Sequence, residues 1–549
     1  MTVTHAGLRP PTRHTRRGVA SRNIRFGTVA RVTTRLRRGH IGIALVLCVS
    51  AAAYAGNLSN PFFGSDTWPW LVSTRIERPE DLLRVAFSPI MSGTNFVAEV
   101  AHFYHPLTAL SYSLDQALFG LSPVAFYATN LLIHLVAVGG LYSLARGLGA
   151  SWWASSACAL MLGCHPVAAA TVPSLPRRQD LVVGALLIGS MSLLARALNE
   201  NIQPRWRWLG GAMVLFFLAL GGKEIAYAGL AVVPFVLACS WPRRLPKQAE
   251  PARIRSMVAL CVAGFVILEV VGFSLRWAVL SGLGGYNGST SAMGTTQGLV
   301  EFYVRPYVTD VLWPFHSAMP DRLRDWLLVL AGIALVVGIA TGGFERPPQL
   351  LVVTGIVWQA AFLGLYAVVH TSLSPYLMYV PLAGLALLVA ALLDGTADRW
   401  QHPARVRRWA RLTGACGVAS AAGSALLLIG VVRTSALLTD YPEFRDAGSA
   451  STQFIDQAMA CLASIPATAA VDVDSLPHRI DYGSSDSQFI DAYVFEAYSL
   501  ESVVRLLAPA HRAPVEVRSV QDVNRRAPSV AVTCVQSGDR WQISARVGP

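Results

Sequence analysis

The chain has 549 residues, of which 53% are hydrophobic and only 14% are charged, and its mean hydropathy is +0.45. This profile excludes an ordinary water-soluble globular protein. The net charge of +13 comes from short basic blocks between long apolar runs, so orientation in a bilayer explains it better than nucleic-acid binding. Six of the eight cysteines lie inside apolar runs, which excludes a disulfide-rich secreted scaffold and a CxxC zinc site.

Residues 1–40 contain ten arginines and no Lys, Asp or Glu. This composition predicts a disordered basic arm at the anionic cytoplasmic leaflet, with a nucleic-acid tail as the less favoured alternative. The first apolar run, Ile41 to Gly56, ends in Ala53-Tyr54-Ala55, which also fits a signal-peptidase site. The length of the basic arm favours a retained membrane anchor.

Apolar runs long enough to span a bilayer, about 20 residues each, recur along residues 41–433 and predict a polytopic, mainly α-helical membrane domain. The loops that would be cytoplasmic with the N-terminus inside carry the arginines, so the N-terminus is predicted inside and, because the number of spans is odd, the C-terminus outside. Arg-, Ala- and Val-rich usage favours a bacterial inner (plasma) membrane as the location. The eleven predicted spans are 41–57, 122–146, 152–172, 181–198, 207–221, 225–241, 256–281, 326–342, 349–369, 375–393 and 411–433.

Two predicted outer loops, 58–104 and 282–325, are long enough to carry a site. In the first, the spacing of Leu82, Leu83 and Phe87 suits a short amphipathic helix on the membrane surface, and an ordinary connecting helix fits equally well. In the second, the glycine-rich run from Gly282 has no following lysine and no preceding strand, so it is no nucleotide-binding loop. We expect it to form a mobile lid.

Residues 434–549 differ in composition from the rest, with nine Arg and fourteen Asp and Glu. Alternating apolar residues near 515–520, 529–535 and 541–547, with helical stretches at 450–463 and 488–508, predict a separate small α/β soluble domain. Cys461 and Cys534 are the two cysteines in polar sequence. In an oxidising compartment they would form a disulfide, and two free buried thiols are the alternative.

Ionisable residues gather at the predicted outer ends of the spans rather than at mid-membrane depth. Such groups are costly to insert, so they call for a partner or a function. Their position predicts a cavity open to the outer leaflet rather than the mid-membrane carboxylates of a proton-coupled transporter. They are Asp66, Glu99, His102, His105, Arg177, Arg178, Asp180, Lys223, Glu224, Arg305, Asp310 and His370.

Five segments in one order resemble the GT-C glycosyltransferases, and most of all the protein O-mannosyltransferases and the membrane half of their tetratricopeptide-bearing relatives. The similarity covers about residues 60–390, and each piece alone is weak. The segments are Asn60-Pro-Phe-Phe-Gly-Ser-Asp66, Tyr104-His-Pro-Leu-Thr with Asn130 and His134 after it, His165-Pro-Val followed by Arg178-Gln-Asp180-Leu, Gly222-Lys223-Glu224, and Tyr376-Leu-Met-Tyr379-Val-Pro381.

The sequence also departs from this family. Ser65 replaces the first acid of the family's acidic pair, and Pro375 stands where relatives often have an arginine. The tetratricopeptide array is absent, and residues 434–549 take its place. The sugar and the acceptor therefore cannot be transferred from the family to this chain.

The resemblance implies transfer of a sugar, with mannose one option, from a polyprenyl-phosphate carrier to a protein or envelope-glycan acceptor on the outer face. Asp66 is the candidate catalytic base or metal-site carboxylate, with a turn-forming Asp as the alternative. The carrier phosphate would be met by Arg177, Arg178 and Lys223, whose alternative is ion pairing of Arg178 with Asp180 and of Lys223 with the adjacent Glu224.

Further candidate substrate-binding residues are Glu224, His102, His105, His370 and Tyr376. His102 and His105 could bind a divalent metal ion or donate to phosphate. His134 and His165 are expected to be hydrogen-bonded packing residues. No nucleotide cofactor and no nucleic-acid partner are expected. The competing hypotheses are a non-catalytic or transport protein that binds polyprenyl-linked lipids, and a membrane-anchored assembly factor.

Overall fold

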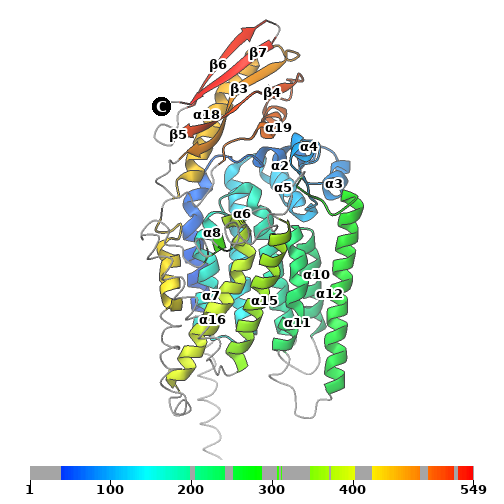
Figure 1. The fold of residues 1–549 in the computed structure, drawn as a ribbon, viewed down its shortest axis with the longest axis vertical. Helices are drawn as coiled ribbons and strands as arrows, with labels where there is room; N and C mark the ends of the chain where they lie inside the picture. Colours follow the sequence, from blue (N-terminus) through cyan, green and yellow to red (C-terminus); the bar gives the residue numbers. More distant parts are fainter. Residues whose placement is uncertain are drawn as a thin grey trace, which may run out of the picture.

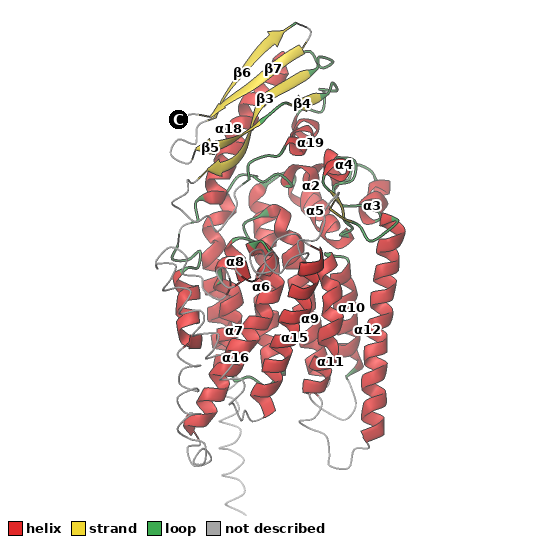
Figure 2. Cartoon of the chain, in the orientation of Figure 1, coloured by secondary structure: helices red, strands yellow, loops and turns green. Residues whose placement is uncertain are grey.

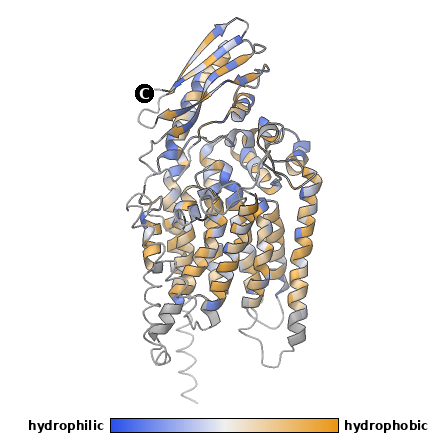
Figure 3. Cartoon of the chain, viewed as in Figure 1, coloured by the Kyte–Doolittle hydropathy of each residue, from blue (hydrophilic) through white to orange (hydrophobic). Residues whose placement is uncertain are grey.

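The computed structural model shows a bundle of long helices with a β-sheet at one end (Figure 1). It describes residues 39–197, 205–240, 251–286, 304, 306–307, 311, 346–369, 373–401, 423–439, 441–481, 493–524, 530–538 and 540–547. Figure 2 shows that the long strands are confined to the C-terminal part, and Figure 3 shows that the helices below it are predominantly hydrophobic. The predicted class, a helical membrane protein with a small C-terminal sheet region, is confirmed in this form.

Within the described residues, six helices are long and apolar enough to cross a membrane. Three shorter apolar helices, Trp206–Leu220, Glu224–Ala238 and Gly423–Arg433, lie at other predicted spans. The predicted span 326–342 and the first half of 411–433 lie outside the described residues. The number eleven and the orientation therefore stay predictions. The six long helices are Gly39–Ser59, Pro123–Gly147, Leu175–Ala197, Ser256–Leu280, Gln349–Val368 and Pro375–Asp394.

The predicted span 152–172 is not one continuous helix. α7 (Trp152–Cys164) ends at His165, because Pro166 disfavours a helical conformation at the residue before it. A short helix, α8 (Pro166–Ala169), and a turn then lead to the 3-10 helix η2 (Leu175–Arg177) and to α9 (Arg178–Ala197). The break places η2 at the end of the bundle that faces the sheet.

Small residues allow close helix contacts in the bundle. α15 (Arg346–Val369) and α16 (Tyr379–Gln401) meet at Gly355 and Gly384, where a Cβ on either glycine would lie 2.7 Å from the carbonyl oxygen of the other. Such small-residue contacts are typical of helices packed in membranes. α6 (Pro123–Gly147) and α10 (Trp206–Leu220) both pack against α9. α12 (Pro251–Leu280) stands at the edge of the bundle (Figure 1).

The first loop folds into three short helices on the sheet-facing end of the bundle, α2 (Thr67–Ser73), α3 (Pro79–Ala86) and α4 (Asn95–Glu99). The helix α5 (Pro106–Phe119) follows the loop. The helix expected around Leu82, Leu83 and Phe87 is confirmed as α3, and these three side chains are exposed. β1 (Ala101–His102) pairs with β2 (Gly285–Tyr286), which joins the first loop to the start of the second. The rest of the predicted lid, from residue 287, lies outside the described residues.

The C-terminal sheet is centred on β3 (Val471–Asp481), which pairs in parallel with β4 (Val515–Val517), β5 (Val520–Asn524) and β7 (Arg540–Val547). β6 (Val530–Ser537) forms an antiparallel hairpin with β7. α18 (Glu443–Ser464) packs on the sheet, and α19 (Ala497–Leu507) lies between the sheet and the first loop (Figure 1). The predicted bridge Cys461–Cys534 is confirmed, with 6.1 Å between the two Cα atoms.

One hydrophobic core joins the first loop to the C-terminal residues. The ring of Phe63 stacks on Phe444 at 4.8 Å between centroids. Gly448 of α18 lies so close to the loop that a Cβ there would be 2.9 Å from Cδ of Pro61. The C-terminal region is therefore packed against the loop that carries Asp66.

Candidate functional site

A pocket of about 190 Å³ lies where the first loop, the break before α9 and the C-terminal region meet. Three of the predicted site residues, Asp66, Arg177 and Tyr376, line it together. Phe444 and Tyr493 of the C-terminal region complete its wall. The pocket thus brings a carboxylate, a guanidinium and aromatic rings together from parts of the chain that are more than 100 residues apart.

Asp66 directly precedes α2, and its side chain does not cap that helix. The turn before it uses Gly64 at φ +94°, a conformation that favours glycine. The Oδ1 atom of Asp66 accepts hydrogen bonds from the hydroxyls of Tyr498 at 2.5 Å and of Ser65 at 3.4 Å. Burial and the Asp66 carboxylate raise the pKa of Tyr498, so its phenol stays a neutral donor.

Arg177 ends η2, and its guanidinium carbon lies 3.5 Å from the centroid of the Tyr376 ring. Tyr376 belongs to the 3-10 helix η7 (Pro375–Met378), which begins α16. This cation–π contact orients the guanidinium beside the pocket without neutralising its charge. Arg177 can therefore meet an anion bound there.

Lys223 is buried and does not line the pocket, and its Nζ atom donates to Oδ1 of Asp180 at 2.8 Å. The hydroxyl of Tyr366 donates to the same oxygen at 3.3 Å. The ammonium lies 5.9 Å from the centroid of the Tyr376 ring, so Tyr376 is close to both Arg177 and this ion pair. The pairing of Lys223 with the adjacent Glu224, the expected alternative, is wrong, because the two side chains have different partners.

Arg178 is fully buried away from the pocket and forms an ion pair with Asp115 at 2.7 Å. Its Nε atom donates to Oδ1 of Asn130 at 2.7 Å, and Nη2 donates to the carbonyl of Phe126 at 2.9 Å. The expected alternative partner, Asp180, is wrong, because Asp180 belongs to the Lys223 pair. Arg178 is therefore a packing residue of the bundle, although it is adjacent in sequence to Arg177, which lines the pocket.

His105 and Glu224 form a buried pair with 2.7 Å between Nε2 and Oε2. This pair holds the start of α5 against the 3-10 helix η3 (Glu224–Ala228). His102 is exposed on β1 opposite Gly285 and does not line the pocket. His370 lies outside the described residues, and so do the side chain of Glu99 and the whole of Asp310 and Arg305.

Among the described residues, no group of three or more His, Cys, Asp and Glu side chains is placed to hold a metal ion. Of the two metal candidates, Asp66 lines the pocket and His102 does not. The described donors at Asp66 do not fit a metal centre.

His134 and His165 are hydrogen-bonded packing residues, as predicted. Both are fully buried. Nδ1 of His134 lies 2.8 Å from the hydroxyl of Tyr379, and Nε2 of His165 lies 3.0 Å from the carbonyl of Val311. His134 thus joins α6 to α16, and His165 joins the turn after α7 to Val311. Neither histidine lines the pocket.

Sequence reasoning did not find the residues that the C-terminal region contributes to the site. The stretch between Tyr493 and Tyr498, Val494-Phe-Glu-Ala497, is mostly apolar and has no recognisable motif, and the role of the two tyrosines depends on how α19 packs. Phe444 follows the acidic Asp440-Tyr-Pro-Glu443 run, and nothing local distinguishes it from a core residue. No sequence signal points to these three positions.

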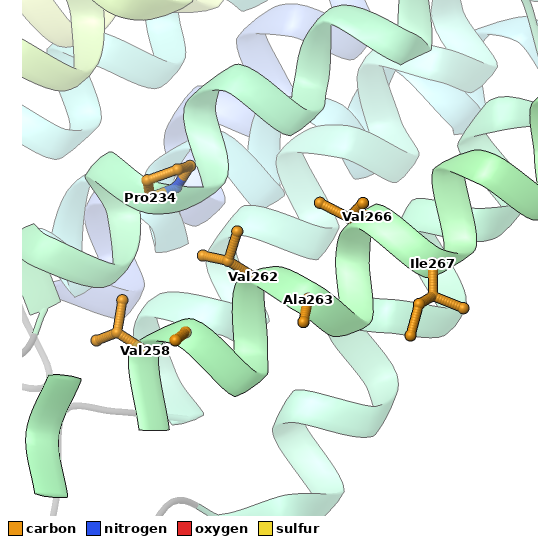
Figure 4. A pocket seen from close by; sticks show the side chains of 7 residues that line it. Pro234, Val258, Val262, Ala263, Val266 and Ile267 are labelled. Carbon is orange, nitrogen blue, oxygen red and sulfur yellow. The ribbon is translucent and has the colours of Figure 1, made fainter. Parts of the chain in front are cut away.

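A second pocket, between α11 (Gly229–Ser240) and α12, is larger, at about 750 Å³, and is lined by apolar side chains such as Pro234, Val262 and Ile267 (Figure 4). All of these residues belong to apolar helices of the bundle. The groove offers no polar group for chemistry, and it lies apart from Asp66.

No protein-family model matches the chain. The protein O-mannosyl-transferase Tmtc2 of Drosophila melanogaster is 28% identical over 247 residues, which is 44% of this chain and 26% of that protein. The human protein O-mannosyl-transferase TMTC2 is 31% identical over 237 residues, 41% of this chain and 28% of that protein. The chain is similar to the protein O-mannosyl-transferases. The resemblance carried by the motifs is thus confirmed, although the similarity spans only about a quarter of the length of these relatives.

Two solved structures have a low similarity to this chain. The crystal structure of ArnT from Cupriavidus metallidurans bound to undecaprenyl phosphate has a TM-score of 0.44 and 14% identity, over 92% of this chain and 97% of that one. The Archaeoglobus fulgidus oligosaccharyltransferase has a TM-score of 0.42 and 10% identity, over 87% of this chain and 64% of that one. These scores are too low to assign the fold or the function of this chain.

Proposed function

We propose that this chain is a GT-C-type membrane glycosyltransferase that moves a sugar from a polyprenyl-phosphate carrier to a hydroxyl acceptor on the outer face of a cell's inner membrane. The observation that carries the proposal is the pocket in which the Asp66 carboxylate and the Arg177 guanidinium lie together. The similarity to protein O-mannosyl-transferases supports it, and their printed names make mannose the first sugar to test.

The reaction needs one proton acceptor and one cation. The acceptor oxygen forms a bond to the anomeric carbon of the sugar, and the bond from that carbon to the carrier phosphate breaks with its electron pair on the phosphate. Asp66 takes the proton of the acceptor hydroxyl. Arg177 stabilises the charge that develops on the departing phosphate, and Lys223 adds a more distant positive charge that Asp180 balances.

The proposal is tested by transfer from radiolabelled polyprenyl-phosphate mannose with the purified protein in lipid nanodiscs. Asp66→Asn keeps the size of the side chain but removes the base, so we expect the rate to fall by about 10²–10⁴. Asp456→Asn makes the same change on an exposed face of α18 and serves as the matched control, with the wild-type rate expected.

Two outcomes would contradict the proposal. A well-folded Asp66→Asn variant with the wild-type rate would show that Asp66 is not the base. A wild-type protein that binds the carrier and transfers no sugar to any hydroxyl acceptor would favour the lipid-binding or transport hypothesis instead.

A further inference from the structure

One side chain of the C-terminal region reaches into the site. Tyr498 lies 432 positions after Asp66 in the sequence, yet its hydroxyl donates a hydrogen bond of 2.5 Å to Oδ1 of Asp66. Among the described contacts, both hydrogen bonds that the Asp66 side chain accepts, from Tyr498 and from Ser65, end on this same oxygen. The described hydrogen bonds therefore constrain one of the two carboxylate oxygens of Asp66.

The position of Tyr498 is fixed by the start of α19. Glu496 precedes the helix, its backbone N–H donates to the Ser499 hydroxyl at 2.9 Å, and that hydroxyl donates to the Glu496 carbonyl at 2.6 Å. This reciprocal capping sets the first turn of the helix, where Tyr498 lies. Its phenol therefore projects from a well-defined helix end.

Two contacts dock α19 on the first loop, one near each end of the helix. The Tyr498 ring packs edge-on against Phe96 of α4, with 5.6 Å between the centroids. About two helical turns further on, Arg505 donates to the backbone carbonyl of Gly93. The ring and the guanidinium thus anchor α19, so the hydroxyl of Tyr498 is not needed to hold it there.

We propose that Tyr498 is a positioning residue, which holds Oδ1 of Asp66 so that the other carboxylate oxygen faces the acceptor hydroxyl. The inference rests on the proposed function of Asp66 as the base. A preorganised carboxylate loses less freedom on the way to the transition state than a rotating one. The C-terminal region then contributes a residue that positions the carboxylate of the proposed base.

The alternative is a contact that only docks the C-terminal region. Kinetics separate the two roles, because a docking contact affects stability and a positioning contact affects turnover. Tyr498→Phe removes the hydroxyl and keeps the ring against Phe96. We expect kcat to fall about tenfold or more, as for loss of a hydrogen bond to a charged group, with KM for the carrier-linked sugar unchanged.

The matched control is Tyr142→Phe, which also removes one phenol hydroxyl, here bonded to the carbonyl of Gly39 at 3.1 Å on another part of the bundle. Its kcat should equal that of the wild type. Arg505→Ala loosens the docking of α19 without touching Asp66, so we expect a lower unfolding temperature than for Tyr498→Phe and a smaller loss of kcat. A wild-type kcat for Tyr498→Phe would overturn the inference.

A second readout does not depend on catalysis. In a double-mutant cycle of Asp66→Ala and Tyr498→Phe, the shifts in unfolding temperature should be non-additive, because the two side chains share one hydrogen bond. Additive shifts would show that the contact is absent in the membrane protein and would also overturn the inference. If the cycle shows coupling and the wild type transfers no sugar, the proposed function fails while the contact stands.

Discussion

The buried ion pair of Arg178 and Asp115 should be a main support of the site, although neither residue lines the pocket. The Arg178 side chain is 0% exposed and that of Asp115 is 5% exposed. Arg178→Met keeps much of the apolar volume and leaves the Asp115 carboxylate buried without its cation. Removing one partner of a buried pair costs about 3–5 kcal/mol, so we expect Arg178→Met to lower the free energy of unfolding by that amount.

The assay is reversible unfolding in detergent micelles, followed by tryptophan fluorescence. The double variant Arg178→Met/Asp115→Asn removes both charges, so it should be more stable than Arg178→Met alone. The control is Arg75→Met, which breaks the exposed pair with Glu77 (3.1 Å; side chains 49% and 65% exposed) and should cost no more than about 1 kcal/mol. The reasoning is refuted if Arg178→Met is as stable as Arg75→Met, or if the double variant is the least stable of all.

The predicted topology makes an alkaline phosphatase fusion after Ala447 active and one after Gln248 inactive, and an active fusion after Gln248 would contradict it. The disulfide closes a loop of 73 positions, so replacing Cys461 and Cys534 by alanine should destabilise the C-terminal region by roughly 4 kcal/mol in the chain-entropy model. Chemical denaturation measures that loss, and alkylation of both native thiols without reductant would show that the bridge does not form.

Local composition was sufficient to predict the apolar helices, the short helix α3, the disulfide and two members of the pocket, Asp66 and Arg177. Both follow apolar runs whose ends are predicted on the same side of the membrane, whereas Tyr376 was predicted from the family resemblance. The central strand β3 was missed. Its alternation of Val471 and Val473 is short, and Pro477 argues against a central strand.

The ion pairs could not be predicted in the same way. Lys223 pairs with Asp180, 43 positions away, and His105 pairs with Glu224, 119 positions away. Sequence spacing favours the adjacent carboxylate, as Glu224 is for Lys223. The rotation of each helix end and the packing of neighbouring helices decide between such partners, and neither is encoded in a local pattern.

These pairings determine which charges remain for chemistry. Arg178 is balanced by Asp115 and Lys223 by Asp180. Arg177 lies against the face of Tyr376, and the carboxylates of Asp66 and Asp180 also interact with its charge. Under the proposed function, a phosphate in the pocket would meet Arg177, the cation among the described lining residues, beside the carboxylate of the proposed base.

The wall that closes this pocket belongs to the C-terminal region. Phe444 and Tyr493 line it, and the same region shares a hydrophobic core with the first loop. Because Gly448 lies against Pro61 with no room for a Cβ, α18 cannot shift toward the loop without moving the turn that precedes Asp66. A change in how the C-terminal region docks would therefore move Asp66 through two contacts. One is this contact of Gly448 with Pro61, and the other is the hydrogen bond from the Tyr498 hydroxyl.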